Sequence, residues 1–109
     1  MIDIKELRAL AADTDDVILT QHVFERIRQR ELKKEDLFSI ILNGEIIEQY
    51  PNDYPFPSCL ILGNSLKGEP LHIVCGLGKN KDGKNKAWVI TAYNPDPNEW
   101  EADLKTRKR

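Results

Sequence analysis

The chain has 109 residues, of which 40% are hydrophobic and 31% are charged, and its formal net charge is −2. This length suits one domain with a single modest core, which we expect at about residues 17–100, followed by a basic tail at 101–109. No stretch approaches the roughly 18 apolar residues of a membrane span, and the N-terminus does not resemble a secretion signal. Because there are only two cysteines, we expect a cytoplasmic protein with reduced thiols.

The weak net charge argues against a strong general attraction to nucleic acid, but the charge is unevenly distributed. Residues 21–36 sum to +1 and residues 79–109 to +3, whereas the rest of the chain is acidic. These basic stretches would let the chain hold a polyanion locally. They are equally consistent with a solvated, lysine-rich turn and a loose tail.

The first part of the chain has helical periodicity. Asp3 and Glu6 have the spacing of a capping box, and Thr20 is a suitable N-cap for a second helix. A third helix has acids in its first turn and is expected to stop at Gly44 in a left-handed conformation. The three helices are predicted near residues 3–12, 20–30 and 35–43, with a short extended run at 17–19.

After Gly44 the apolar residues alternate, which is typical of strands. Four strands are predicted near residues 46–50, 58–63, 71–77 and 87–93, separated by turns rich in glycine, proline and lysine. The near-continuous apolar character of 71–77 favours a central position. The sequence therefore predicts an α+β fold, with two to three N-terminal helices packed on a four-stranded antiparallel meander.

Polar groups flank the apolar stripe of the helix at 20–30. On a helical wheel His22, Arg26 and Arg30 lie together, beside the stripe that contains Val23 and Ile27. A sheet packed beneath could bring further side chains to them, so they are candidate site residues. The alternative is structural: a partly buried histidine, with arginines that pair with neighbouring glutamates.

Three polar residues lie within the third and fourth predicted strands. His72 is in the third strand, and Thr91 and Tyr93, two residues apart, share a face of the fourth. These two strands pair antiparallel, so the numbers of any two facing residues add up to a constant. A constant of 163 or 165 would put all three residues on one face, whereas 164 would separate His72 from the other two. A bulge caused by the glycine-rich turn could set this register. His72 could also be a core histidine held by hydrogen bonds.

The same strand comparison places Cys59 opposite Cys75 if the second and third strands pair with a sum of 134. We expect two buried, reduced thiols there, in preference to a disulfide. Neither the cysteines nor the histidines have the spacing of a metal site, so no metal is predicted.

The motifs TQHVFERIRQR, ILNGEIIEQYP, PSCLILG, LHIV and WVITAYNPDPNEW, in this order, resemble the domain-of-unknown-function 4258 family over about residues 17–100. That family resembles, more distantly, RelE-like toxins and the barnase, EndoU and colicin group of metal-independent ribonucleases. The resemblance implies a toxin-like RNA endonuclease with a RelE-like fold. It also implies an antitoxin protein partner, of the zinc-finger kind often encoded beside such genes, and possible association with the ribosome.

The family's functional positions match His22, Arg26, Arg30, His72 and the Thr91-x-Tyr93 pair. Cleavage through the RNA 2′-OH needs a base, an acid and cations for the phosphate, and it needs neither metal nor cofactor. Either histidine could be the base, the two arginines would hold phosphate, and Thr91 would bond a phosphate oxygen. Tyr93 would be the acid or position the substrate. The alternative is a non-catalytic RNA- or protein-binding module of the same fold.

The match has two departures: Glu31-Leu32 stands where a glycine and a β-branched residue are expected, and the chain is acidic where RelE-like toxins are basic. Four further aromatic residues, two in the proline-rich loop and two late in the chain, have a structural and a functional interpretation. Tyr54 and Phe56 are expected to cap one end of the core, and Trp88 and Trp100 to cover the sheet. Tyr54, Phe56 and Trp100 could instead stack on bases of single-stranded RNA.

Overall fold

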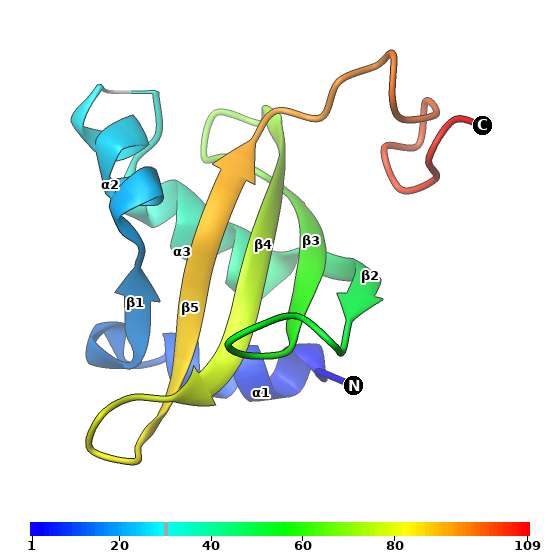
Figure 1. The fold of residues 1–109 in the computed structure, drawn as a ribbon. Helices are drawn as coiled ribbons and strands as arrows, with labels where there is room; N and C mark the ends of the chain where they lie inside the picture. The colour runs from blue at the N-terminus through cyan, green and yellow to red at the C-terminus, as the bar shows by residue number, and fades with distance from the viewer. Residues whose placement is uncertain (30) are drawn as a thin grey trace.

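The computed structural model describes residues 1–29 and 31–109, which form three α-helices and one five-stranded sheet (Figure 1). In this described part of the chain, no helix is both long enough and apolar enough to cross a membrane. The elements are α1 (Ile4–Ala11), a 3-10 turn η1 (Thr14–Asp16), β1 (Val17–Leu19), α2 (Gln21–Arg28), α3 (Lys34–Asn43), β2 (Glu45–Tyr50), β3 (Ser58–Asn64), β4 (Pro70–Lys79) and β5 (Asn85–Tyr93).

The sheet has the strand order β1-β5-β4-β3-β2. The four strands from β2 to β5 are antiparallel, as predicted, and β4 is the central strand. The α+β class is confirmed, but the prediction of four strands missed a fifth. This strand, β1, pairs in parallel with β5, from Val17 opposite Ala87 to Leu19 opposite Val89. A run of only three residues carries too little pattern to reveal a partner about seventy residues away.

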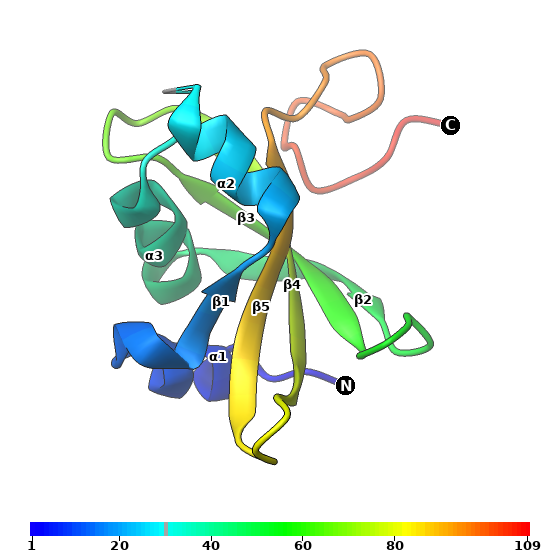
Figure 2. The ribbon, with the colours of Figure 1, turned by 60° about the vertical axis from the view of Figure 1, so that its left-hand side comes forward.

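The helices cover one face of the sheet, and the chain after β5 leaves on the other side (Figure 2). The capping box of Asp3 and Glu6 opens α1 as predicted. Cys59 and Cys75 lie opposite each other in the core, buried and reduced, which confirms their predicted pairing. The core joins residues from α1, α3 and the sheet, among them Leu7, Ala11, Leu37, Ile40, Ile41, Cys59, Ile61, Ile73, Cys75 and Val89.

Gly44 ends α3 for a different reason from the one predicted. Its φ is −84°, so it is not left-handed. A Cβ at this position would lie 2.5 Å from the carbonyl oxygen of Ile40 and 2.6 Å from that of Leu62, so only glycine lets the chain turn so close to both. The Arg8 side chain donates to the carbonyl oxygens of Ile41 and Gly44, which satisfies acceptors at the end of the helix.

The segment after β5, residues 94–109, packs on the sheet face opposite the helices, whereas the sequence suggested a loose tail at 101–109. Trp100 is only 2% exposed and pairs through its backbone with Arg107. Lys105 forms an ion pair with Glu45, and Arg107 forms one with Glu48, so both cations are anchored to β2. These ion pairs, together with hydrogen bonds inside the segment, fix its path.

Candidate functional site

The candidate site begins with the pairing of β4 and β5. His72 lies directly opposite Tyr93, and Val74 lies opposite Thr91, both with a sum of 165. The register then shifts, because Cys75 pairs with Val89 and Ile90 is left without a partner. This bulge places His72, Thr91 and Tyr93 on one face of the sheet, which is one of the two arrangements that the sequence allowed.

His72 is completely buried on that face. Its Nε2 lies 2.8 Å from the carbonyl oxygen of Leu104, and its Nδ1 lies 3.3 Å from the hydroxyl of Tyr93. Because a carbonyl can only accept, Nε2 carries the proton, and Nδ1 accepts from the Tyr93 hydroxyl. The ring of Trp100 meets the imidazole edge-on, with ring centroids 4.5 Å apart.

The protonation states follow from this burial. Loss of solvation lowers the pKa of His72, outweighing the opposite effect of the bond to the Leu104 carbonyl. Burial likewise raises the pKa of Tyr93. At neutral pH the pair is therefore a neutral imidazole and a protonated phenol, which makes His72 a group that holds Tyr93 in place. Tyr93 and Thr91 themselves are half-buried, so both reach the surface.

Three residues that the sequence analysis missed adjoin this pair: Glu48, Tyr50 and Arg107. The Nε and one Nη of Arg107 donate to the two oxygens of the Glu48 carboxylate, each at 3.0 Å, and the Tyr50 hydroxyl donates to the same carboxylate. The bonds from Arg107 lower the pKa of Glu48. Burial and the bond to Glu48 raise the pKa of Tyr50 to about 12. Glu48 and Tyr50 are two residues apart in β2, and that spacing could have suggested a shared face.

The helix α2 starts beside the bulge. The backbone N–H of Thr20 donates to the Val89 carbonyl at 3.2 Å, and its hydroxyl donates to the Ile90 carbonyl at 2.9 Å. The helix that carries His22 and Arg26 therefore begins beside the end of β5 that carries Thr91 and Tyr93. It packs on the other face of the sheet, however, because its Val23 joins the core that contains Ile73 and Ala92. This anchoring also means that the Thr20 hydroxyl caps the sheet edge rather than the helix.

The predicted residues of α2 differ in their surroundings. His22 is exposed, whereas the Arg26 side chain is 19% exposed and binds Glu31 at 2.9 Å. Leu32, the other departure from the family pattern, is buried in the core. Arg30 lies outside the described residues. Among those that are described, no hydrogen bond or ion pair joins His22 or Arg26 to the group on β4 and β5.

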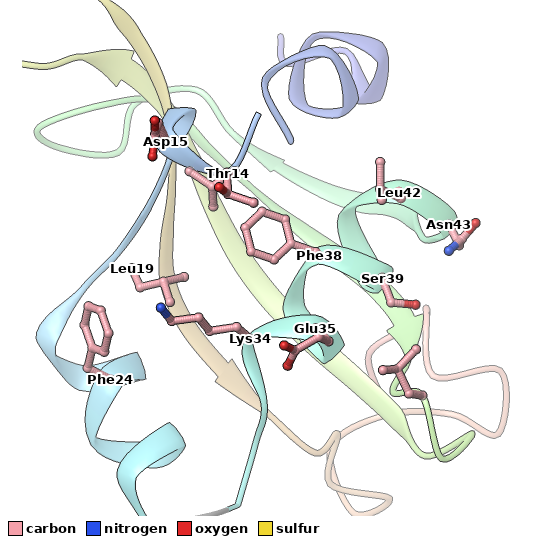
Figure 3. A pocket seen from close by; sticks show the side chains of 12 residues that line it. Thr14, Asp15, Leu19, Phe24, Lys34, Glu35, Phe38, Ser39, Leu42 and Asn43 are labelled. Carbon is pink, nitrogen blue, oxygen red and sulfur yellow. The ribbon is translucent and has the colours of Figure 1, made fainter. Parts of the chain in front are cut away.

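A pocket with a volume of about 740 Å³ lies elsewhere, between α2, α3 and β1. It is mainly apolar, and Figure 3 shows Leu19, Phe24 and Phe38 converging on it. The described chain exposes five large hydrophobic side chains, and three of them, Phe24, Leu42 and Leu66, line this pocket. None of the predicted site residues does so. An exposed apolar cluster of this kind is typical of a surface that contacts another molecule.

Comparison with known proteins identifies a family but no individual relative. No curated protein and no solved structure matches the chain. The model of the family described as "Domain of unknown function (DUF4258)" matches residues 19–94, from the end of β1 to the end of β5. The match includes α2, the bulge and the His72–Tyr93 pair, and it stops before Trp100, Leu104 and Arg107. The chain therefore belongs to the DUF4258 family.

Proposed function

We propose that this protein is a toxin-like, metal-independent RNA endonuclease that acts in the prokaryotic cytoplasm. The proposal rests on one observation: Thr91 and Tyr93 reach the surface at the end of β5 beside which the helix bearing His22 and Arg26 begins. The two groups lie on opposite faces of the sheet, so the RNA would pass around this end of β5 to contact both. The resemblance to RelE-like toxins, which concerns the same residues, agrees with it. These are the groups that 2′-OH attack on a phosphodiester needs.

In the proposed reaction the 2′-oxygen attacks phosphorus, its proton passes to His22, and the bond from phosphorus to the 5′-oxygen breaks. The products are a 2′,3′-cyclic phosphate and a 5′-hydroxyl. Arg26 and Arg30 would hold the phosphate oxygens, and Thr91 would donate to one of them. His22 is the better base, because it is exposed, whereas His72 is buried with both ring nitrogens bonded.

His72 then has a positioning role. Its Nδ1 accepts a hydrogen bond from the Tyr93 hydroxyl across 3.3 Å, and this bond is long and therefore weak. The Tyr93 hydroxyl can turn from His72 to the leaving 5′-oxygen at little cost and act as the acid. Tyr93→Phe should reduce the cleavage rate, whereas His72→Asn should alter the rate only through the placement of Tyr93.

A second candidate is a non-catalytic RNA-binding module of the same fold. Its specific support is that His72 is locked between two partners and that Arg26 is occupied by Glu31. Such a chain would keep the family architecture while its polar groups serve the fold.

Incubation of the purified protein with end-labelled RNA in EDTA separates the two. Nuclease action predicts products with 2′,3′-cyclic phosphate ends, lost in His22→Ala and in Arg26→Ala, and no cleavage of RNA with a 2′-deoxy nucleotide at the cut site. Binding without any cleavage, with ribosomes present as well as absent, supports the non-catalytic module instead. Cleavage that survives both alanine variants contradicts the assigned site.

We also propose a protein partner, an antitoxin of the zinc-finger type, bound in the apolar pocket of Figure 3. The exposed side chains of Leu42 and Leu66 would be covered by such a partner. Expression of the protein alone should arrest growth, and co-expression of the antitoxin should relieve the arrest. Leu42→Ser and Leu66→Ser should still arrest growth but should no longer be neutralised. Neutralisation that is unchanged in both variants would place the partner elsewhere.

A further inference from the structure

A pair of aromatic rings lies on the same sheet face, beyond the part that the C-terminal segment covers. Phe56 and Trp88 stack with ring centroids 5.0 Å apart and planes at 27°. Phe56 rests on Gly78, where a Cβ would lie 1.9 Å from its ring, and the Trp88 indole donates to the Gly78 carbonyl at 3.1 Å. Because Gly76 and Gly78 have no side chains, the sheet surface is depressed here, and the two rings fill the depression, which we call the glycine bed.

A third aromatic residue lies just before Phe56 in the chain. Tyr54, two residues before Phe56, is 95% exposed, so the expectation that it caps the core is wrong. Exposure of nearly a whole phenol ring gains nothing for the fold. A flat, solvent-facing ring is, however, the type of group on which a nucleic-acid base stacks.

The turn between β4 and β5 supplies positive charge at the same end of the face. Lys79, Lys81 and Lys84 are exposed, and Asp82 is the only acid among them. Within the described residues none of these three lysines is in an ion pair. The fourth lysine of the hairpin, Lys86, differs, because it is committed to Asp16 at 2.8 Å.

These groups line up with the candidate site. Trp88 and Tyr93 lie on one strand, five residues apart, which corresponds to about 16 Å at roughly 3.3 Å per residue. Thr91 lies between them on the same face. A chain lying along β5 would therefore pass from the lysines over the rings to Thr91 and Tyr93.

We propose that Tyr54, the Phe56–Trp88 pair and the lysines at 79, 81 and 84 form a binding track for single-stranded nucleic acid, which leads along β5 into the candidate site. Bases stack on the exposed aromatic surface, and the lysines neutralise phosphates. The track rests on the proposed function for the identity of its natural ligand, RNA, but it binds any single strand, because stacking and phosphate contacts require no 2′-hydroxyl.

The test measures fluorescence anisotropy of a labelled ten-nucleotide oligo-dT, with oligo-rU of the same length as a second arm. The DNA probe cannot be cleaved through a 2′-OH, so its binding is independent of nuclease activity. We expect Tyr54→Ala to weaken binding about fivefold or more. The double variant K81A/K84A should reduce the salt slope of log K by about 1.4, or about 0.7 for each phosphate that is no longer neutralised.

Matched controls use the same changes elsewhere on the surface. Lys5 and Lys67 are exposed outside the hairpin, and K5A/K67A removes the same charge. Leu66→Ala removes an exposed apolar side chain as Tyr54→Ala does. The track is supported if the hairpin variant loses more salt slope than K5A/K67A and Tyr54→Ala loses more affinity than Leu66→Ala. It is overturned if the paired variants behave alike or if neither oligonucleotide binds the unaltered protein at low salt.

The two proposals fail separately. Oligo-dT binding that depends on Tyr54 and the lysines, together with intact RNA in the cleavage assay, supports the track and overturns the nuclease. RNA cleavage whose KM is unchanged in Tyr54→Ala and K81A/K84A overturns the track and leaves the nuclease standing.

Discussion

His72 and Tyr93 face each other across β4 and β5, and the tyrosine donates its hydroxyl proton to Nδ1 of the histidine. This contact exists because the bulge at Ile90 shifts the register by one residue. Without the shift, Tyr93 would turn toward the helices and the imidazole would lose a partner. A single extra residue in β5 therefore decides which side chains share the open face.

The first prediction concerns pH. Unfolded chains protonate histidine with a pKa near 6.5, whereas burial lowers the pKa of His72 in the fold. Between these two pKa values the unfolded state binds more protons than the folded state. The contribution of His72 to the free energy of unfolding is therefore fully present above about pH 6.5 and is lost as the pH falls toward its lowered pKa. The charged groups around His72 partly cancel, because Glu48 raises its pKa and Arg107 lowers it.

Urea unfolding at about pH 7.5 and about pH 5.5 tests this. The unaltered protein should lose stability between the two, and His72→Gln should lose less, because glutamine does not titrate. Equal losses would assign the pH dependence to other groups.

A second prediction uses Trp100, whose ring covers His72. Trp100→Ala would open the imidazole to water, so the pKa of His72 should rise toward about 6.5. Loss of so large a buried ring should also cost about 3–5 kcal/mol. An NMR titration of the imidazole protons follows His72. Trp88→Ala is the control, since it removes a tryptophan that does not touch His72. If both variants gave the same pKa for His72, Trp100 would not be what excludes water.

Two glycines of the fold should respond differently to a methyl group. Gly44→Ala brings Cβ within 2.6 Å of two backbone oxygens, which cannot move without breaking α3 from β3. At Gly76 the atom nearest to a new Cβ would be the tip of the Ile90 side chain, at 3.3 Å, which can rotate away, and the Pro57 carbonyl oxygen at 3.5 Å is an ordinary contact. We expect a loss of about 1–3 kcal/mol for the first, typical of overpacking, and a smaller loss for the second. Thermal unfolding measures both, and equal values would mean that the backbone at Gly44 relaxes.

The sequence predicted what local patterns encode. Periodicity predicted the helices and the four long strands to within a few residues. Symmetric pairing about the turn placed Cys59 opposite Cys75 correctly, because the pairing of β3 with β4 contains no bulge. The same arithmetic left two registers open for His72, since a bulge is a choice between structures of similar local energy. The outcome depends on the packing of Trp100 and Leu104 around the imidazole, which no local pattern encodes.

The C-terminal segment shows the limit most clearly. Lys105 and Arg107 look like part of a basic tail, but their partners Glu45 and Glu48 lie about sixty residues earlier. An ion pair over such a distance leaves no periodic signal. Burial of Trp100 and the cation–π contact of Arg107 with its ring, at 4.6 Å, accompany these pairs. Positioning of the segment is thus a tertiary effect.

The two cysteines give a further prediction. Burial raises the pKa of the Cys59 thiol to about 12 and raises that of Cys75 as well. Since the thiolate is the reactive form, neither should react with a thiol reagent at about pH 8 while the protein is folded. The same protein in denaturant should titrate two thiols. Fast reaction of either thiol without denaturant would show that the sheet opens locally.

The last prediction concerns Glu31, which replaces the glycine expected from the family pattern and binds Arg26. If Arg26 holds phosphate, the pair competes with the substrate, so Glu31→Gln should strengthen RNA binding. The gain should not exceed about fivefold, because a partly exposed ion pair is worth little. Anisotropy with oligo-dT, which cannot be cut through a 2′-OH, measures affinity, and end-labelled RNA in EDTA measures cleavage. Glu25→Gln is the matched control, because it makes the same charge change on α2, the helix that carries Arg26. Equal gains in both variants would show that only the net charge matters. A gain confined to Glu31→Gln would identify Arg26 as a phosphate-binding group for which Glu31 competes with the substrate.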